Sequence, residues 1–323
     1  MAGQIFATNS LGGFMYSLNL SDELREALQP MSRFRQFCEP MDGDGKNRGQ
    51  TFTWDVYGNV ATAGGTLVET NTMPETNSAI TQATLTITEY GNSVPYSGKL
   101  EALAKFQVRK PVMQALRNDA VKTYDRAAYA QFYLTKLRVF PTAGSSTSAV
   151  TLTTNGTMTG TNTVALGVGH VKAIVDTMKE RNIPGYIGDD YMSIAWPTTL
   201  RTFKNSLETL HQYTAAGIQL IFNAEIGRYE NVRFTEQTNC AHGITATGAS
   251  GTAWSTAVSD WAFFFGEDTV VEGIAIPEEI RAKIPTDYGR SKGVAYYSIN
   301  GFGLVHNQTD ATESRVVMWD SAA

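Results

Sequence analysis

Apolar residues recur at helical spacing most clearly between residues 111 and 136. They follow one another every three or four positions, the pattern of one buried face of an α-helix, and include Val112, Leu116, Ala120, Thr123, Ala127, Ala130 and Leu134. Pro111 suits the first turn, where no intrahelical N–H donor is needed. At 1.5 Å per residue this helix would be about 40 Å long, enough to brace the whole chain.

Residues 41–98 have a different pattern. The segments "QTFTWDVYGN" and "ATLTITEYG" alternate as β-strands do, and "ATAGGTLVETNTMPETNSAI" lies between them. Two strands joined by a long connection rich in Gly, Thr, Asn and Pro predict a protruding β-loop. Because this loop has too little apolar surface for a core of its own, we expect it to pack on other structure, another chain included.

The rest of the chain mixes short helices and strands. Residues 1–20 predict an extended arm, and a short helix from about Asp22 is capped by Ser21. Further helices are predicted at 162–182, 198–211 and "PEEIRAK", where Glu278 and Glu279 suit the N-terminus. Short apolar strands are predicted at "YMSIAW", "GIQLIF", "NVRFTE" and "DWAFFFG", and the closing segments "VAYYSINGFGLVH" and "RVVMW" are predicted to pair. The fold class is therefore α+β.

Composition and charge narrow the function classes. The 323 residues carry a net charge of −5, which argues against gripping nucleic acid over a broad face but not against enclosing it. Only 18% of residues are charged, which favours a surface covered by partners. Cys38 and Cys240 lack a CxxC context, so neither a disulfide framework nor a zinc site is indicated. The sequence starts without a signal-peptide pattern and has no membrane-spanning apolar run, and we expect synthesis in a cytoplasm.

One motif suggests catalysis. Gly289 to Gly293 spells G-x-S-x-G, the nucleophile elbow of serine hydrolases, with Ser291 at its centre. That elbow needs a strand before the serine and a helix after it, whereas here an alternating strand follows. His306 also precedes Asp310, the reverse of the hydrolase order. The favoured interpretation is a Gly-flanked turn leading into a strand, and a serine hydrolase using Ser291 is the less favoured alternative.

Other chemical motifs are incomplete. Gly167-x-Gly169 opens a helix like a dinucleotide site, but Lys172 stands where a third Gly or Ala belongs. Asp42-x-Asp44 resembles the start of a calcium loop, but Lys46 occupies a ligand position. The four histidines share no ligand spacing. No catalytic, cofactor or metal site is predicted.

Several sequence segments between about residues 50 and 303 resemble those of one protein family. They are "TFTWDVYGNVATAGGTLVETNTMPE", "TLTITEYGNSVPYSGKLE", "AQFYLTKLRVFPTAG", "EIGRYENVRFTEQTN" and "IPEEIRAKIPTDYGRSKGVAYYSINGFG". The sequences of these segments and the order of the predicted elements are similar to those of the HK97-fold major capsid proteins of tailed bacteriophages. The resemblance covers most of the chain and contains no chemical motif.

The resemblance implies a division of the chain. It comprises an N-terminal arm (1–40), an extended β-loop over a neighbouring subunit (41–98), a peripheral domain with the long helix as its spine (99–161), an axial domain (162–275), and a return to the peripheral domain (276–323). The resemblance also implies a structural subunit that is not an enzyme and has no cofactor. This subunit would self-assemble as hexamers and pentamers into the icosahedral virion shell. That shell would enclose double-stranded DNA without sequence-specific binding and without a membrane, after assembly in the host cytoplasm.

The implied partners are the chain itself, portal and scaffolding proteins, and a decoration protein. Candidate inter-subunit contacts are Trp54, Tyr57, Glu69, Glu75, Arg290 and Lys292. Some relatives cross-link a Lys to an Asn, but Lys46, Asn47, Asn71 and Asn77 form no identifiable trio with a carboxylate, so none is assigned. A second alternative is another virion component, such as a tail or decoration protein, which would be strand-dominated and lack the long helix.

Overall fold

A computed structural model describes most of the chain. The described residues are 28–42, 49–60, 64–70, 72–73, 75–76, 78–142, 150–157, 164–211, 228–240, 243–244, 250–251, 261–285, 287–306 and 313–321. The predicted helix from Asp22, the strand "GIQLIF" and the candidate cross-linking residues Lys46, Asn47, Asn71 and Asn77 lie outside them.

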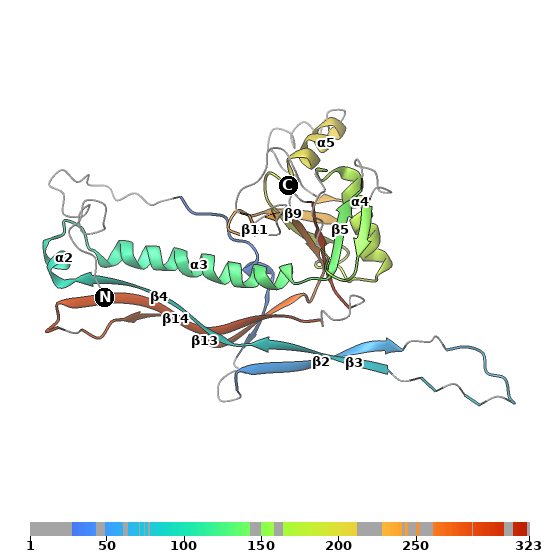
Figure 1. Ribbon diagram of the computed structural model, residues 1–323, viewed down its shortest axis with the longest axis horizontal. Helices are drawn as coiled ribbons and strands as arrows, with labels where there is room; N and C mark the ends of the chain where they lie inside the picture. The colour runs from blue at the N-terminus through green and yellow to red at the C-terminus, as the bar shows by residue number, and fades with distance from the viewer. Residues whose placement is uncertain are drawn as a thin grey trace.

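Two mixed sheets and one long helix organise the described residues (Figure 1). The elongated four-stranded sheet has the order β1 (Glu39–Asp42), β13 (Val270–Ala282), β14 (Ser291–Leu304), β4 (Thr88–Ser97). The seven-stranded sheet has the order β6 (Val150–Thr153), β5 (Leu137–Pro141), β15 (Val316–Trp319), β12 (Ala262–Phe265), β7 (Tyr191–Ala195), β9 (Val232–Glu236), β8 (Arg228–Tyr229). A separate hairpin pairs β2 (Thr51–Val60) with β3 (Ser78–Thr86), and β10 (Gly243–Ile244) pairs with β11 (Ser250–Gly251).

The predicted long helix is α3 (Arg109–Tyr133), which follows the short helix α2 (Gly98–Leu103). Pro111 lies in its first turn, as expected. The predicted end at residue 136 is too late, because the helix ends at Tyr133 and exposed Leu134 is its C-cap. The predicted apolar face is right in the first half and wrong in the second, where Ala130 is exposed. The buried positions there are instead Tyr124, Asp125, Ala128 and Phe132. The buried positions recur every four residues, whereas 3.6 residues make one turn. The buried face therefore rotates by about 40° around the helix axis from each buried position to the next.

The alternation of β14 is confirmed. Val294, Tyr296 and Ser298 are buried on the side of α3, and the intervening residues are half-buried. The predicted helix "PEEIRAK" is wrong, because these residues continue β13 and pair with β14 from Glu279↔Tyr297 to Ala282↔Val294. Cross-strand pairing outweighs the local charge pattern: the Arg281 guanidinium stacks 3.9 Å from the Tyr297 ring centroid. Pro277, which has no N–H to donate, falls at a register shift in the ladder.

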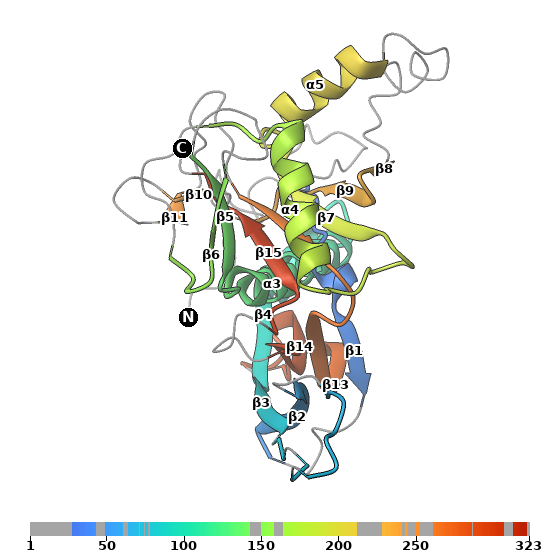
Figure 2. The ribbon, with the colours of Figure 1, turned by 90° about the vertical axis from the view of Figure 1, so that its right-hand side faces the viewer.

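The predicted β-loop is confirmed as the β2–β3 hairpin, which lies on the face of the four-stranded sheet opposite α3 (Figures 1 and 2). The hairpin crosses the sheet closely where glycines leave room. A Cβ added at Gly301 would lie 2.4 Å from the backbone oxygen of Thr86, and one at Gly303 would lie 3.0 Å from the Leu85 Cβ. The sequence "INGFG" therefore places the root of the hairpin.

Helices cover both faces of the seven-stranded sheet. On one side, α4 (Val168–Glu180) and α5 (Arg201–His211) bury Val171, Ile174, Met178 and Phe203 against its strands (Figure 2). The second half of α3 packs on the other side through Phe132. The predicted helices at 162–182 and 198–211 are confirmed in kind, and the first begins at Val168 rather than at 162. No described helix is long and apolar enough to cross a membrane.

The predicted pairing of the two closing strands is wrong. β14 lies between β13 and β4, whereas β15 pairs with β12 and β5 in the other sheet. Pairing therefore crosses the predicted boundaries. β4 belongs to the four-stranded sheet rather than to the hairpin, and β15 pairs with β12 of the predicted axial domain as well as with β5 of the predicted peripheral domain. The five domain ranges themselves stay predictions.

Candidate functional site

Ser291 has the geometry of a turn residue, not of a nucleophile. It opens β14 directly after the turn at Gly289, whose φ is +85°, and its backbone is paired with Ser97. Its Oγ accepts a hydrogen bond from the Lys283 Nζ at 2.6 Å. A lysine that activates a serine has to be desolvated, but Lys283 is exposed. The predicted interpretation, a Gly-flanked turn leading into a strand, is confirmed.

The described histidines lie away from Ser291. His306 follows the far end of β14, and 13 residue steps along that strand separate Ser291 from Leu304 by about 40 Å. His170 is buried, accepts the Gly167 N–H at its Nδ1, and stacks on Trp319. His242 lies outside the described residues. Nor does the described part of the chain contain a group of three or more His, Cys, Asp or Glu residues that could hold a metal ion.

The root of the hairpin is fixed to the four-stranded sheet. Leu85 and Ile87 form an apolar cluster with Val271 and Val305, and Phe52 and Trp54 pack against it. The Trp54 Nε1 donates to the Val305 carbonyl oxygen at 2.8 Å, and the Thr81 Oγ1 donates to Glu313 at 2.8 Å. These contacts join residues more than 230 positions apart in sequence.

Away from the root, the hairpin is exposed. Tyr57 is 79% exposed, and large apolar side chains lie open to solvent at Leu67, Val68, Met73 and Ile80. We call Leu67, Val68 and Met73, which are 58–65% exposed, the hairpin tip. Apolar side chains gathered on one protruding element indicate a surface that a partner covers.

The structure separates the six predicted contact residues. Trp54 is engaged within its own chain, whereas Tyr57, Glu69 and Glu75 are exposed on the hairpin. At the other end of the molecule, Lys292 pairs with Glu101 at 2.6 Å, and exposed Arg290 lies 3.7 Å from Asp287. The two groups therefore form two patches, and their role in contacts between subunits stays a prediction.

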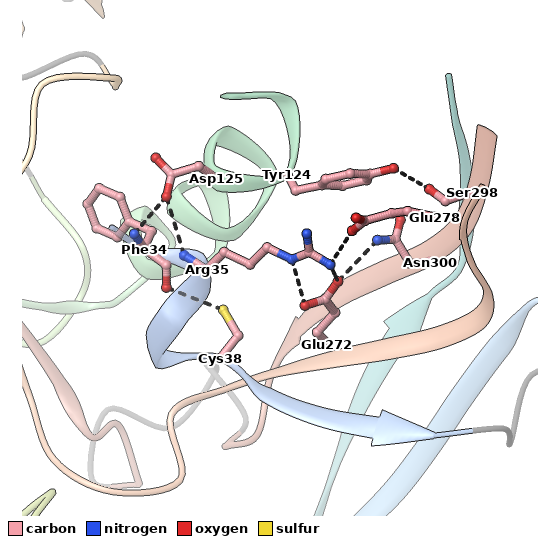
Figure 3. Close-up of polar contacts among 9 residues, drawn as sticks. All are labelled: Phe34, Arg35, Cys38, Tyr124, Asp125, Glu272, Glu278, Ser298 and Asn300. Atoms are coloured by element: carbon pink, nitrogen blue, oxygen red, sulfur yellow. Dashed lines mark hydrogen bonds and ion pairs between the residues drawn. The ribbon is translucent and has the colours of Figure 1, made fainter. Parts of the chain in front are cut away.

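A buried charged cluster connects the N-terminal segment to the long helix (Figure 3). Arg35, in the single-turn η1 (Arg35–Phe37), lies between Tyr124 of α3 and the strand β13. Its guanidinium donates to both oxygens of Glu272 at 2.8 and 3.0 Å, pairs with Glu278, and stacks 4.6 Å from the Tyr124 ring centroid. Glu272 is only 5% exposed, whereas the Arg35 side chain keeps 32% of its exposure, so the carboxylate is the desolvated partner of this pair.

Asp125 completes this cluster from the next position of α3. Its carboxylate accepts the Phe34 N–H at 2.7 Å, the Arg35 N–H at 3.3 Å and the Asn239 side-chain N–H at 3.0 Å. One buried carboxylate thus ties the N-terminal segment, the long helix and the loop after β9 together. We call Arg35, Tyr124, Asp125 and Glu272 the clamp.

The charges of the clamp stabilise the fold and do not activate the two cysteine thiols beside it. Burial works against the charged guanidinium, but the hydrogen bond and charge of Glu272 outweigh it, so the pKa of Arg35 is raised above its usual value. Burial, with the charge of Glu272, also raises the pKa of the Cys38 thiol. Burial and the charge of Asp125 raise the pKa of Cys240. Because the thiolate is the nucleophile, neither thiol has the environment of a reactive cysteine.

Sequence reasoning missed the clamp entirely. Arg35 and Glu272 are 237 positions apart, and Asp125 lies within an otherwise apolar helix face. The one available signal was that charged residue, since an acid on the buried side of a helix needs a buried partner.

The comparisons with protein families and with solved structures both find phage capsid proteins. Residues 12–130 match the model of the Phage capsid family. A comparison with curated proteins finds no match.

Solved structures extend the likeness to nearly the whole chain. The capsid of Ralstonia phage GP4 aligns at 16% identity and a TM-score of 0.64, covering 100% of this chain and 98% of that one. The cyanophage Pam1 capsid aligns at 14% identity and 0.66, covering 95% and 96%. The capsid of Helicobacter pylori bacteriophage KHP30 aligns at 13% identity and 0.63, covering 99% and 98%. The chain therefore has the HK97-like α+β fold of phage capsid proteins, as predicted.

Proposed function

We propose that this chain is the major capsid protein of a tailed bacteriophage, a structural subunit that assembles with copies of itself into the virion shell. Three findings support the proposal: the family match over residues 12–130, a shared fold along nearly the full length of known capsid proteins, and the absence of a reactive arrangement around Ser291 in the described residues. The shell would be icosahedral and enclose double-stranded DNA.

The observation that carries the proposal is the β2–β3 hairpin. Its root is fixed by Trp54 and the glycines of β14, yet its tip carries Leu67, Val68 and Met73 into solvent. Exposed apolar side chains at the end of an element whose root is anchored mark a surface that another molecule covers. In a shell, the neighbouring subunit is the molecule within reach, and overlapping arms bury large areas without a thick subunit.

The finer partners follow from this role. Copies would meet in hexamers and pentamers, and a portal protein, a scaffolding protein and a decoration protein would contact the shell. Assembly would take place in the host cytoplasm. The two alternatives are less well supported: a tail or decoration protein would be strand-dominated, whereas α3 runs for 25 residues, and a hydrolase would need a base beside Ser291.

The first test is the mass of the purified full chain by size-exclusion chromatography with light scattering, followed by negative-stain microscopy. Closed shells, or rings of five or six chains, are the expected result. A single 35.2 kDa chain that remains so with crowding agents and added scaffolding protein would contradict the proposal.

The second test removes the apolar hairpin tip. We expect Leu67→Asn/Val68→Asn/Met73→Asn to lower the assembled fraction at least tenfold. The free energy of unfolding should change by less than about 0.5 kcal/mol, because exposed residues contribute little to folding. The control, Leu152→Asn/Ile187→Asn, replaces exposed apolar residues of β6 and of the turn before β7, away from the hairpin, and should leave assembly unchanged. Equal assembly in both variants would contradict a role for the tip.

A further inference from the structure

Charge is distributed unevenly along the chain. Residues 49–98 contain no Lys or Arg and four acids, Asp55, Glu69, Glu75 and Glu89. Residues 99–138 contain nine Lys or Arg and three acids. A net charge of −5 for the whole chain therefore hides a basic region around α3.

In the structure, most of the cations of α3 lie on the molecular surface. The cations of α3 are Arg109, Lys110, Arg117 and Arg126, all exposed, and Lys122, which is half-buried. Within the described part of the chain, none of these five forms an ion pair. We call them the basic stripe.

The two acids of α3 do not offset this charge. Asp119 accepts hydrogen bonds from Asn92 and Tyr296 at the sheet, and Asp125 is buried in the clamp. Asp125 is thus withdrawn from solvent and half-buried Asp119 is bonded to the sheet, whereas four of the five cations are exposed. The charge that the helix presents to solvent is therefore predominantly positive.

The basic stripe and the hairpin lie on opposite faces of one sheet. Figures 1 and 2 show α3 covering one face of the β13–β14–β4 sheet and the cation-free hairpin on the other. If the chain forms a closed shell, one face is turned inward and the other outward. The inward face meets a dense array of phosphates, and the outward face does not.

We infer that the basic stripe of α3 binds the phosphate backbone of double-stranded DNA and forms part of the inner surface of the shell, an inference that rests on the proposed function. From Arg109 to Arg126 the helix advances about 26 Å, alongside which one DNA strand presents roughly seven phosphates. Lys and Arg on a helix contact phosphates without reading bases, so this binding is independent of sequence. Few cations and an overall acidic chain keep the contact weak and sensitive to salt.

The other occupant to consider is the acidic end of the hairpin of a second copy. Glu69 and Glu75 provide only two charges against five. The hairpin also presents exposed apolar side chains, which the cations of the stripe do not match. A long polyanion fits the number and the spacing of the cations better.

Binding to a 30-base-pair duplex tests the inference without requiring assembly. Anisotropy titrations between 25 and 200 mM NaCl give the slope of log K against log salt, about −0.9 per phosphate contact. Lys110→Gln/Arg117→Gln should reduce the steepness of that slope by about 1.8 and weaken binding at 25 mM at least tenfold. The control, Lys179→Gln/Arg201→Gln, removes one Lys and one Arg that are exposed on α4 and α5 and should bind like the wild type. Equal losses in both variants, or none in either, would overturn the inference.

Lysine acetylation of assembled particles tests the orientation. Lys110 and Lys122 should be modified at least threefold less in DNA-filled particles than in DNA-free shells, whereas Lys179 should be modified equally in both. Equal modification of Lys110 in both particles would overturn the inference, as would protection in DNA-free shells, which would mean that a protein covers the stripe. Light scattering on the same samples reports assembly, so a chain that binds DNA but never forms shells would refute the proposed function and not the duplex binding.

Discussion

The hairpin and the long helix are attached to the same sheet in opposite ways. On the hairpin face, the attachment is apolar and steric: the Thr86 backbone passes over Gly301, Leu85 fits over Gly303, and Trp54 adds one hydrogen bond. On the helix face, the attachment includes buried charge, with Arg35 paired to Glu272 and Asp125 accepting three N–H donors.

The difference shows how one subunit combines a fixed arm with a connected core. Apolar contacts through glycines hold the hairpin root in one register and are little affected by salt or pH. The clamp joins three segments distant in sequence, and each loses its buried partner if another leaves. We therefore expect a substitution in the hairpin root to cause a moderate loss of folding stability, and a substitution in the clamp to cause a large one.

The largest expected effect is in the clamp. Arg35→Met leaves Glu272 buried without its cation, and removing one partner of a buried pair costs about 3–5 kcal/mol. Urea denaturation of the unassembled chain measures this change. In Arg35→Met/Glu272→Met most of the loss should be recovered, because no unpaired charge is then buried.

A surface pair provides the control for the clamp. Lys292→Met breaks the exposed contact with Glu101 and should cost less than about 1 kcal/mol. If Arg35→Met costs no more than Lys292→Met, the clamp does not hold the N-terminal segment.

A smaller effect is expected at the hairpin root. Gly301→Ala places a Cβ 2.4 Å from the Thr86 oxygen, a backbone atom that moves only if the strand moves. Overpacking of this kind costs about 1–3 kcal/mol. We expect the midpoint of urea denaturation to fall and the assembled fraction to fall with it, since the hairpin is displaced. Gly64→Ala, where nothing lies within 4 Å of the added Cβ, is the matched control and should behave like the wild type.

The smallest effect is a pH dependence near the hairpin. Burial, together with the charge of Arg315, lowers the pKa of His306 below 6.5, although Asp268 and Glu313 oppose this. The native state then binds a proton less readily than the unfolded chain. The contribution to stability is present above pH 6.5 and is lost as the pH falls toward the lowered pKa. Denaturation at pH 7.5 and 5.5 should show this loss in the wild type and not in His306→Gln, and an equal loss in both would exclude His306 as its source.

The sequence by itself determined the long helix, the hairpin and the alternation of β14. Each depends on neighbours three, four or two positions apart, so local pattern is sufficient to predict it. The tip of the hairpin was also predictable as a surface, because its connection has too little apolar content for a core. Rejection of Ser291 as a nucleophile needed only the order of strand and turn around it.

Only the tertiary structure decided the rest. "PEEIRAK" has the charges of a short helix, yet it lies in β13 because β14 pairs with it. β15 pairs with β5 and β12 rather than with β14, a choice that depends on the packing of the whole seven-stranded sheet. The clamp and the basic stripe depend on which side of α3 each charge occupies. That side is set by the drift of the buried face along the helix, from Val112 to Phe132, against a sheet whose strands are distant in sequence.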